Sequence, residues 1–303
     1  MAGSKHGVRS KCSYAAGGQS IAEYIVSRRI GDATITLISE GTFDWPPNYQ
    51  VPEAEWRVAL PEADADGRIT LGLHVAHVRL GGASILIDPG CDDPDSEWSA
   101  EFFNSYASVT RTPGTAAALA EISVTPEEIT HIAISHGHGD HLAGLVVLRG
   151  GKCVPRFPNA RHYIGRADWE NAPQRANPKS DLVRCIGTVA EAGLLELIDR
   201  ECEIAPGVTL IPTPGETAGH LVVRVDSNDE RFFYLGDLFH HAAEIAHLDW
   251  ISPRRDQPAM IASRRRVVEE SVSSGATCIY THHPFPGWGR IAATGDGYRW
   301  VQG

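Results

Sequence analysis

Short runs of β-branched and apolar residues alternate along the chain with helical patterns and turn residues. The run at 33–38 predicts a strand, because alternating Thr and Ile side chains suit a pleated surface. Residues 73–80 and 83–87 flank Gly81 and Gly82, and a two-residue glycine turn between apolar runs predicts a β-hairpin. The segment 41–61, which is rich in proline and aromatic residues, predicts a long ordered loop.

Helix signals follow these first strands. Thr125, Pro126 and Glu128 form a capping box with proline at the first helical position, which predicts a short helix. Longer helices are predicted at 96–106, 115–122 and 258–274, the last ending before Gly275. Further strands are predicted at 131–135, 161–164, 208–211, 221–225, 232–235 and 278–280. Strands that alternate with helices, with hairpins among them, predict a layered α/β protein with mixed sheets.

The composition sets the scale of the protein. The chain has 303 residues, of which 42% are hydrophobic, enough to bury one large core or two small ones. Residues 1–20 are polar and rich in Gly, Ser, Lys and Arg, and are expected to form a flexible arm. Neither a signal-peptide core nor an apolar run long enough to span a membrane is present, so we expect a cytoplasmic protein.

The net charge limits the expected binding partners, and the cysteine spacing indicates the redox compartment. The net charge of -11 repels phosphate backbones and anionic lipid, so neither nucleic acid nor a membrane is an expected partner. The six cysteines are scattered without a paired spacing, which favours free thiols in a reducing compartment over a disulfide framework.

Four side chains of metal-ligand type lie in the six residues that follow the strand predicted at 131–135. They are His136, His138, Asp140 and His141, separated by Gly137 and Gly139. Alternation along an extended segment directs the first three to one side, and a turn at Gly139 can bring in the fourth. Imidazole and carboxylate groups suit zinc and other borderline divalent metals. The 136–141 run therefore predicts part of a metal site.

One short run cannot enclose two metal ions, so further ligands must come from later in the chain. His220 ends a turn rich in Gly and Pro, immediately before a predicted strand. Asp237 follows the strand predicted at 232–235, and His282 and His283 follow the strand predicted at 278–280. Because ligands commonly converge at strand ends, these residues are expected to share one site with the 136–141 run.

The chain resembles the metallo-β-lactamase fold superfamily over roughly residues 33–292. The resemblance rests, in chain order, on Asp88-Pro89-Gly90, the 136–141 run, His220, Asp237 and His282. The segment 282–289 resembles the branch that contains methyl parathion hydrolase and related lactonases, and this alignment favours His282 over His283 as the ligand. The resemblance implies a four-layer αββα sandwich of two mixed β-sheets, formed by a single catalytic domain at 21–303.

The resemblance also implies two divalent metal ions per chain, with Zn²⁺ as the first choice and Mn²⁺, Co²⁺ or Fe²⁺ as alternatives. One ion would be bound by His136, His138 and His220. The other would be bound by Asp140, His141 and His282. Asp237 would bridge the two ions, and Asp88 would orient the ligand loop from behind. Glu216 stands where many relatives carry a histidine, and is interpreted as a loop residue.

A site of this kind has a defined chemistry. Two ions that share a carboxylate can also share a water molecule and lower its pKa, so a bridging hydroxide forms near neutral pH. Attack of this hydroxide on a small-molecule lactone or carboxylic ester is the predicted activity. Hydrolysis of organophosphate triesters at the same site is the alternative. A mononuclear iron oxidoreductase of the persulfide dioxygenase type is less favoured, because the second-metal ligand set is complete. Relatives in this branch commonly dimerise, so a homodimer is expected.

Two residues are assigned catalytic roles, Asp140 and His240. In acyl-homoserine lactonases of the family a tyrosine follows the bridging aspartate by three residues, and His240 takes that position here. His240 is therefore a candidate proton donor, with a loop histidine outside the chemistry as the alternative. Four aromatic side chains are candidate substrate contacts, with packing in the core as the alternative: Trp45, Phe239, Phe285 and Trp288.

Overall fold

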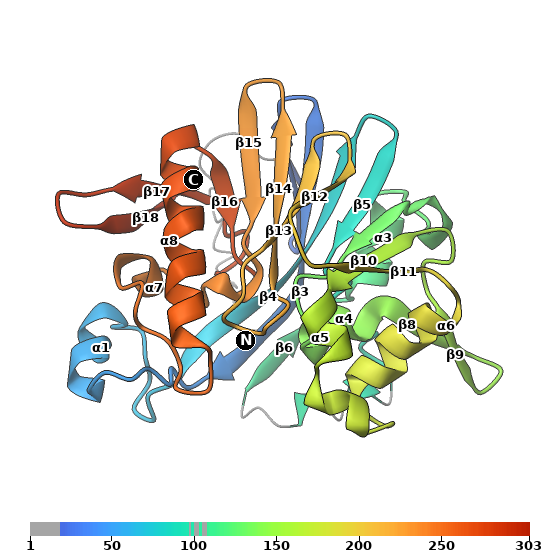
Figure 1. The fold of residues 1–303 in the computed structure, drawn as a ribbon, viewed down its shortest axis with the longest axis horizontal. Coiled ribbons are helices and arrows are strands. Elements are labelled where there is room, and N and C mark those ends of the chain that lie inside the picture. The colour runs from blue at the N-terminus through green and yellow to red at the C-terminus, as the bar shows by residue number, and fades with distance from the viewer. Residues whose placement is uncertain (1–18, 97, 100–102, 105–107) are drawn as a thin grey trace, which may run out of the picture.

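Two large mixed sheets form the centre of the molecule (Figure 1). The computed structural model describes residues 19–96, 98–99, 103–104 and 108–303. Within these residues the first sheet has the order β1-β2-β3-β4-β5-β7-β10-β11, with β6 paired to β3. Its strands are β1 (Gln19–Ala22), β2 (Ile25–Ile30), β3 (Ala33–Trp45), β4 (Ile69–Leu80), β5 (Ala83–Ile87), β6 (Val109–Arg111), β7 (His131–Ala133), β10 (Arg161–Gly165) and β11 (Leu195–Ile198). The pairs β5–β7, β7–β10 and β10–β11 are parallel, and the others are antiparallel.

The second sheet runs in strict chain order from β12 to β18. Its strands are β12 (Cys202–Ala205), β13 (Val208–Pro212), β14 (Leu221–Ser227), β15 (Glu230–Tyr234), β16 (Thr277–Ile279), β17 (Gly289–Ala293) and β18 (Tyr298–Gln302). Only the pair β15–β16 is parallel among these described strands, because the long helix α8 (Gln257–Ser274) intervenes between them. A separate hairpin joins β8 (Val146–Arg149) and β9 (Lys152–Pro155).

Helices cover the outer faces of both sheets. Among the described residues, the α-helices are α1 (Glu53–Ala59), α3 (Thr115–Glu121), α4 (Gly139–Leu142), α5 (Arg166–Glu170), α6 (Thr188–Glu191), α7 (Ala243–Ala246) and α8 (Gln257–Ser274). Short turns of other helix types are η1 (Pro126–Glu128), η2 (Ala143–Leu145), η3 (Pro173–Ala176), η4 (Val183–Gly187) and η5 (Gly236–Leu238). In Figure 1 the helices α3 to α6 gather on one side of the sheets, and α1, α7 and α8 on the other.

Apolar side chains on opposite strand faces build separate cores, because successive residues of a strand point to opposite sides. In β5, Ile85 and Ile87 join the core between the two sheets, whereas Leu86 joins the core beneath α3. In β15, Phe232 joins the core between the sheets, whereas Phe233 joins the core beneath α8. Three stacked cores require four layers, and the predicted αββα sandwich is confirmed.

The structure confirms much of the predicted element order and corrects the loop at 41–61. The β4–β5 hairpin forms as expected, and α8 starts at an Asp256 cap and ends at Gly275, whose φ is +64°. Within 41–61, however, β3 continues to Trp45 and α1 occupies Glu53–Ala59. The proline-rich composition concealed both elements. The C-terminal hairpin β17–β18 was also not predicted.

Some expectations fall on residues that the structure does not describe. The arm expected at 1–20 lies outside the described residues as far as residue 18, and Gln19 already begins β1. The helix expected at 96–106 also falls largely outside them. The described cysteines are free, as expected; Cys12 lies outside the described residues. No described helix is both long and apolar enough to cross a membrane.

Candidate metal centre

Asp88 fixes the start of the loop that carries the 136–141 run. It lies directly after β5, next to the end of β7, and is fully buried. Its carboxylate accepts hydrogen bonds from the Ser135 amide at 2.6 Å, the Ser135 hydroxyl at 2.8 Å and His141 Nδ1 at 2.8 Å. With Nδ1 engaged, His141 presents its other ring nitrogen, Nε2, to the centre of the site. Asp88 thus has the orienting position that the sequence resemblance implied.

A second buried carboxylate, Asp168 in α5, joins the 136–141 loop to the turn before His220. It accepts hydrogen bonds from the Gly137 amide at 2.9 Å, the Gly219 amide at 2.6 Å and the Thr217 hydroxyl at 2.6 Å. Sequence reasoning missed this residue, because an aspartate in a short helix carries no signal of its own. The contacts show that Asp168 positions two ligand-bearing segments at once.

His220 and Asp237 come together through a glycine. His220 Nδ1 lies 2.8 Å from the Thr213 hydroxyl, and its Nε2 accepts a hydrogen bond from the Asp237 amide at 3.1 Å. Gly236 lies between the two segments with a φ of +56°, and a Cβ atom there would stand 2.8 Å from His220 Nε2. Only glycine allows this close approach at the end of β15.

His282 is tied to the first sheet, although it follows a strand of the second. Its Nδ1 donates to the Gly72 carbonyl at 2.8 Å, and the Gly72 amide donates to the His282 carbonyl at 3.0 Å. His282 Nε2 then lies 3.1 Å from Asp237 Oδ2. His283 instead donates from Nδ1 to the Pro284 carbonyl at 2.7 Å and packs beside Tyr280. The geometry therefore brings His282, and not His283, to the site.

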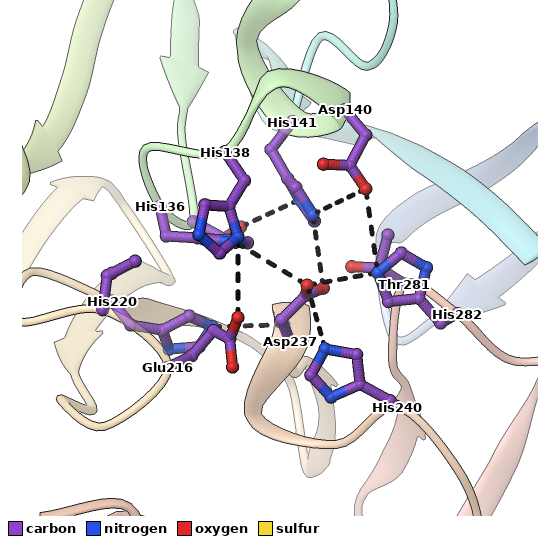
Figure 2. A network of polar contacts seen from close by, with 12 residues as sticks. His136, His138, Asp140, His141, Glu216, His220, Asp237, His240, Thr281 and His282 are labelled. Atoms are coloured by element: carbon purple, nitrogen blue, oxygen red, sulfur yellow. Dashed lines mark hydrogen bonds and ion pairs between the residues drawn. The ribbon is translucent and has the colours of Figure 1, made fainter. Parts of the chain in front are cut away.

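Asp237 lies at the centre of the assembled cluster (Figure 2). Its carboxylate oxygens lie 3.3 Å from His141 Nε2 and 3.6 Å from His136 Nε2, in addition to the contact with His282. Asp140 Oδ2 lies 3.5 Å from His141 Nε2 and 3.8 Å from His282 Nε2. One carboxylate therefore contacts ligand-type nitrogens on both sides of the cluster, as a bridging ligand must.

The electrostatics of the cluster suit a cation. Burial lowers the pKa of His136 and brings the pKa of His220 to about 3, so both rings are neutral and keep a lone pair. Burial alone would raise the pKa of Asp237, but His282 and His141 outweigh it and hold that pKa well below its usual range. Neutral imidazoles beside an ionised carboxylate are the donor set of a divalent metal.

Two buried atoms support the same conclusion. His141 Nε2 and Asp237 Oδ1 lie 3.3 Å apart, and neither makes a hydrogen bond within the described part of the chain. Burial opposes a charge on His141, yet Asp237, Asp140 and Asp88 together raise its pKa well above the usual value. Surroundings that attract a proton so strongly can hold a metal ion in its place. The residues present therefore fit the two-ion site that the sequence implies.

His240 is part of the cluster and not an isolated loop residue. Its ring is stacked between Trp45 and His282, with centroid distances of 5.3 Å to each. Its Nε2 lies 3.4 Å from Asp237 Oδ2, and its amide donates to Glu244 at 3.0 Å. Burial opposes its protonation, but Asp237 and Glu244 prevail and raise the pKa of His240 to about 10. His240 is thus a protonated group within reach of the metal cluster.

Two cavities open beside the cluster. The larger, of about 390 Å³, is lined by Trp45, Tyr49, His240 and Trp250, among others. The smaller, of about 320 Å³, lies against Gly137, His138, Asp168 and Leu182. Glu216, Arg254 and Arg255 line both cavities and so mark the boundary between them. A substrate at the metals can therefore extend in two directions.

The four aromatic side chains predicted to contact substrate lie in different parts of the structure. Trp45 lines the larger cavity, in agreement with a substrate contact. Phe239 is fully buried beneath α8, and Trp288 is fully buried between the sheets, so neither lines these two cavities, and their roles as substrate contacts stay predictions. Phe239 follows the turn η5 and Trp288 directly precedes β17, and the sequence alone does not reveal which way either side chain faces. Phe285 packs against the ring of His74 and lines neither cavity.

Glu216 is not the ordinary loop residue that the sequence indicated. Its side chain is 1% exposed and forms an ion pair with Arg255, whose Nε donates to Glu216 Oε2 at 2.7 Å. The other carboxylate oxygen, Oε1, lies 3.5 Å from His138 Nδ1. An acidic residue four positions before His220, in a tight turn, was the signal that could have identified it.

A family model described as the metallo-beta-lactamase superfamily matches residues 75–283, which is more than half of the chain. The chain belongs to the metallo-beta-lactamase superfamily. Among solved structures, this superfamily member is similar to AidC, described as a dizinc quorum-quenching lactonase in complex with a product, at 22% identity and a TM-score of 0.72. That similarity covers 95% of this chain and 97% of the other. The hydrolase AbOPH is similar at 21% identity and a TM-score of 0.73, over 96% and 98% of the two chains. At these identities the likeness establishes the fold alone.

Curated relatives within the metallo-beta-lactamase superfamily match over shorter stretches. A probable metallo-hydrolase of Mycobacterium bovis is 25% identical over 190 residues, which are 57% of this chain and 58% of the relative. An N-acyl homoserine lactonase of Bacillus cereus is 30% identical over 109 residues, which are 36% and 38% of the two chains. The chain therefore spans less than two thirds of the length of these relatives.

Donor atoms in this superfamily member fall into compact groups. One group combines His136, His138, Glu216 and Asp237, and another combines Asp140, His141 and His282. Within each group all donor atoms lie within 4.8 Å of one another. Asp237 also groups with His240 and His282. His220 reaches the cluster through the Asp237 amide. The structure thus gathers every ligand that the sequence named and adds Glu216, while the ligand roles themselves stay predictions.

Proposed function

We propose that this chain is a metal-dependent hydrolase that opens a lactone or carboxylic ester at a two-ion centre. The contact of the Asp237 carboxylate with His136 on one side, and with His141 and His282 on the other, is the observation that carries the proposal. Two divalent ions held by these groups supply water activation near neutral pH and stabilise the negative charge that develops on the substrate.

The residues around the metals complete the proposed chemistry. His240 carries a proton at neutral pH and lies beside Asp237, so it can donate that proton to the departing alkoxide. Trp45 and Trp250 give the larger cavity apolar walls, which suit the hydrocarbon part of an ester or lactone. The named activities of the lactonases described above support a lactone as the substrate class.

Metal analysis combined with a substrate panel tests the proposal. Purified protein is expected to contain about two divalent ions per chain and to hydrolyse lactones or aryl esters, because the ligand set is complete. Faster hydrolysis of phosphotriesters than of carboxylic substrates would favour the alternative activity. A single iron per chain, with no hydrolysis of any of the three classes, would overturn the proposal.

The pH dependence of kcat tests the role of His240. Its raised pKa means that the proton-donating form is fully present at neutral pH and is lost as the pH rises through that pKa. Asp237 raises the pKa of His240, whereas metal cations bound beside it would lower that pKa. The fall in kcat at alkaline pH is therefore expected below pH 10.

His240→Gln is expected to lower kcat by about 10²-fold and to remove the fall in kcat at alkaline pH, the alkaline limb of the pH profile. His131→Gln is a suitable control, because His131 lies at the start of β7, at the opposite end from the ligand run. An alkaline limb that persists unchanged in His240→Gln would assign the titration to another group.

A further inference from the structure

We propose that Glu216 is an additional metal ligand, which adds a carboxylate oxygen to the position formed by His136 and His138 and is held there by Arg255. The inference rests on the proposed two-ion function and extends it to a residue specific to this chain. It gives the turn at 213–220 a second ligand besides His220.

The distances in this corner of the site match those between ligands of one ion. Atoms bound to zinc at about 2.1 Å with tetrahedral angles lie about 3.4 Å apart. Glu216 Oε1 lies 3.5 Å from His138 Nδ1, and Asp237 Oδ2 lies 3.6 Å from His136 Nε2. His136 Nε2 and His138 Nδ1 are 2.8 Å apart. Figure 2 shows the Glu216 carboxylate directed toward His138. One ion can therefore contact all four side chains after small side-chain adjustments.

The turn that carries Glu216 is held rigidly. Gly215 has a φ of +145°, and a Cβ atom there would lie 2.3 Å from the Met260 side chain, so the turn packs directly on α8. Ser263 in α8 donates to the Pro214 carbonyl at 2.8 Å, and the Asp256 amide donates to the Gly215 carbonyl at 3.1 Å. Rigid support of this kind is what a preformed ligand requires.

Arg255 fixes the carboxylate itself. Two of its nitrogens contact the two oxygens of Glu216, so the plane of the carboxylate is set. Arg255 remains 28% exposed, whereas Glu216 is 1% exposed and lies against His138. An ion pair that served the surface alone would not require the carboxylate to be buried toward the histidines. The arrangement indicates that Glu216 serves the metal cluster and that Arg255 positions it.

An added carboxylate changes which ions the site favours. Carboxylate ligands suit Mn²⁺ better than an imidazole-rich site does. With Glu216, the His136 and His138 position should therefore accept Mn²⁺ more readily than the same position would without it.

Competition with a graded chelator measures the affinity for each ion without any substrate. Glu216→Gln is expected to bind one ion as the wild type does and the other at least ~10-fold more weakly. Substitution of a residue that only supports a metal ligand already lowers metal affinity by about 10- to 100-fold. Glu270→Gln is the matched control, because Glu270 also pairs with arginines, Arg224 and Arg231, but lies away from the site. It is expected to bind both ions as the wild type does.

The outcomes separate this inference from the proposed function. Fewer than two ions in the wild type would contradict the two-ion function itself. Two ions in the wild type, with equal affinities in Glu216→Gln and Glu270→Gln, would overturn the role of Glu216 alone. Arg255→Gln provides a second test if Glu216→Gln does not fold. It is expected to weaken the binding of the same ion, but to a smaller degree. An unchanged Co²⁺ absorption spectrum in both site variants would likewise overturn the inference.

Discussion

Asp237→Ala is expected to lower kcat/KM by about 10³-fold and to remove at least one of the two ions from each chain. The carboxylate contacts nitrogens on both sides of the cluster, and truncation to alanine removes all of these contacts. Loss of a group that stabilises transition-state charge costs about 10²- to 10³-fold, and loss of an ion adds to that cost. Metal content and kcat/KM of the same purified sample measure both effects.

Asp226→Ala is the control for this experiment. Asp226 is also an aspartate of the second sheet that contacts cations, Arg224 and Arg231, but it lies on β14 away from the metal cluster. It is expected to keep two ions and wild-type activity. Two ions and full activity in Asp237→Ala would show that this carboxylate does not bridge the ions.

Arg264→Met is expected to lower the free energy of unfolding by about 3–5 kcal/mol, the largest stability effect that we predict. Arg264 is 1% exposed within α8, and its guanidinium donates to the carbonyls of Leu238 at 2.8 Å and Trp250 at 2.9 Å. It also pairs with the buried carboxylate of Glu244. Methionine fills similar space but removes the cationic partner of that buried carboxylate and the donor to both carbonyls.

Denaturant unfolding measures this difference, and the adjacent residue supplies the control. Arg265 is exposed on the same helix, so Arg265→Met is expected to change the free energy of unfolding by less than about 0.5 kcal/mol. Glu244 also accepts hydrogen bonds from Tyr49 and from the His240 amide. Loss of its partner should therefore loosen the wall of the larger cavity as well. Equal stability of the two variants would contradict the structural role of Arg264.

The convergence of the candidate metal ligands could be predicted because their signals are local. The 136–141 run follows an apolar strand within a few residues, and Asp237 and His282 each follow a short apolar strand. Strand ends at one edge of a sheet converge, so a one-dimensional pattern carries three-dimensional information there. The two mixed sheets could be anticipated on the same basis, because hairpins and alternating helices have recognisable patterns.

The supporting residues could not be predicted, because their roles depend on contacts between distant segments. Asp168 and Glu216 are single acidic residues in polar surroundings, and only the folded chain shows that both are buried against ligand segments. Phe239 and Trp288 lie beside ligands in sequence but face a core. Phe239 follows the turn η5 and Trp288 directly precedes β17, so the direction of each side chain depends on contacts with distant segments. Helix α1 was hidden by the prolines around it.

The paired hydrogen bonds between Gly72 and His282 determine when the site can exist. They join residues that are 210 positions apart, and such a contact forms only after the intervening chain has been ordered. A chain still emerging from the ribosome can present the 136–141 run, but it lacks His282 until synthesis has passed that residue. Completion of the centre therefore coincides with the docking of the second sheet on the first. In the proposed two-ion centre, binding of the full metal complement would therefore report that the two sheets have docked.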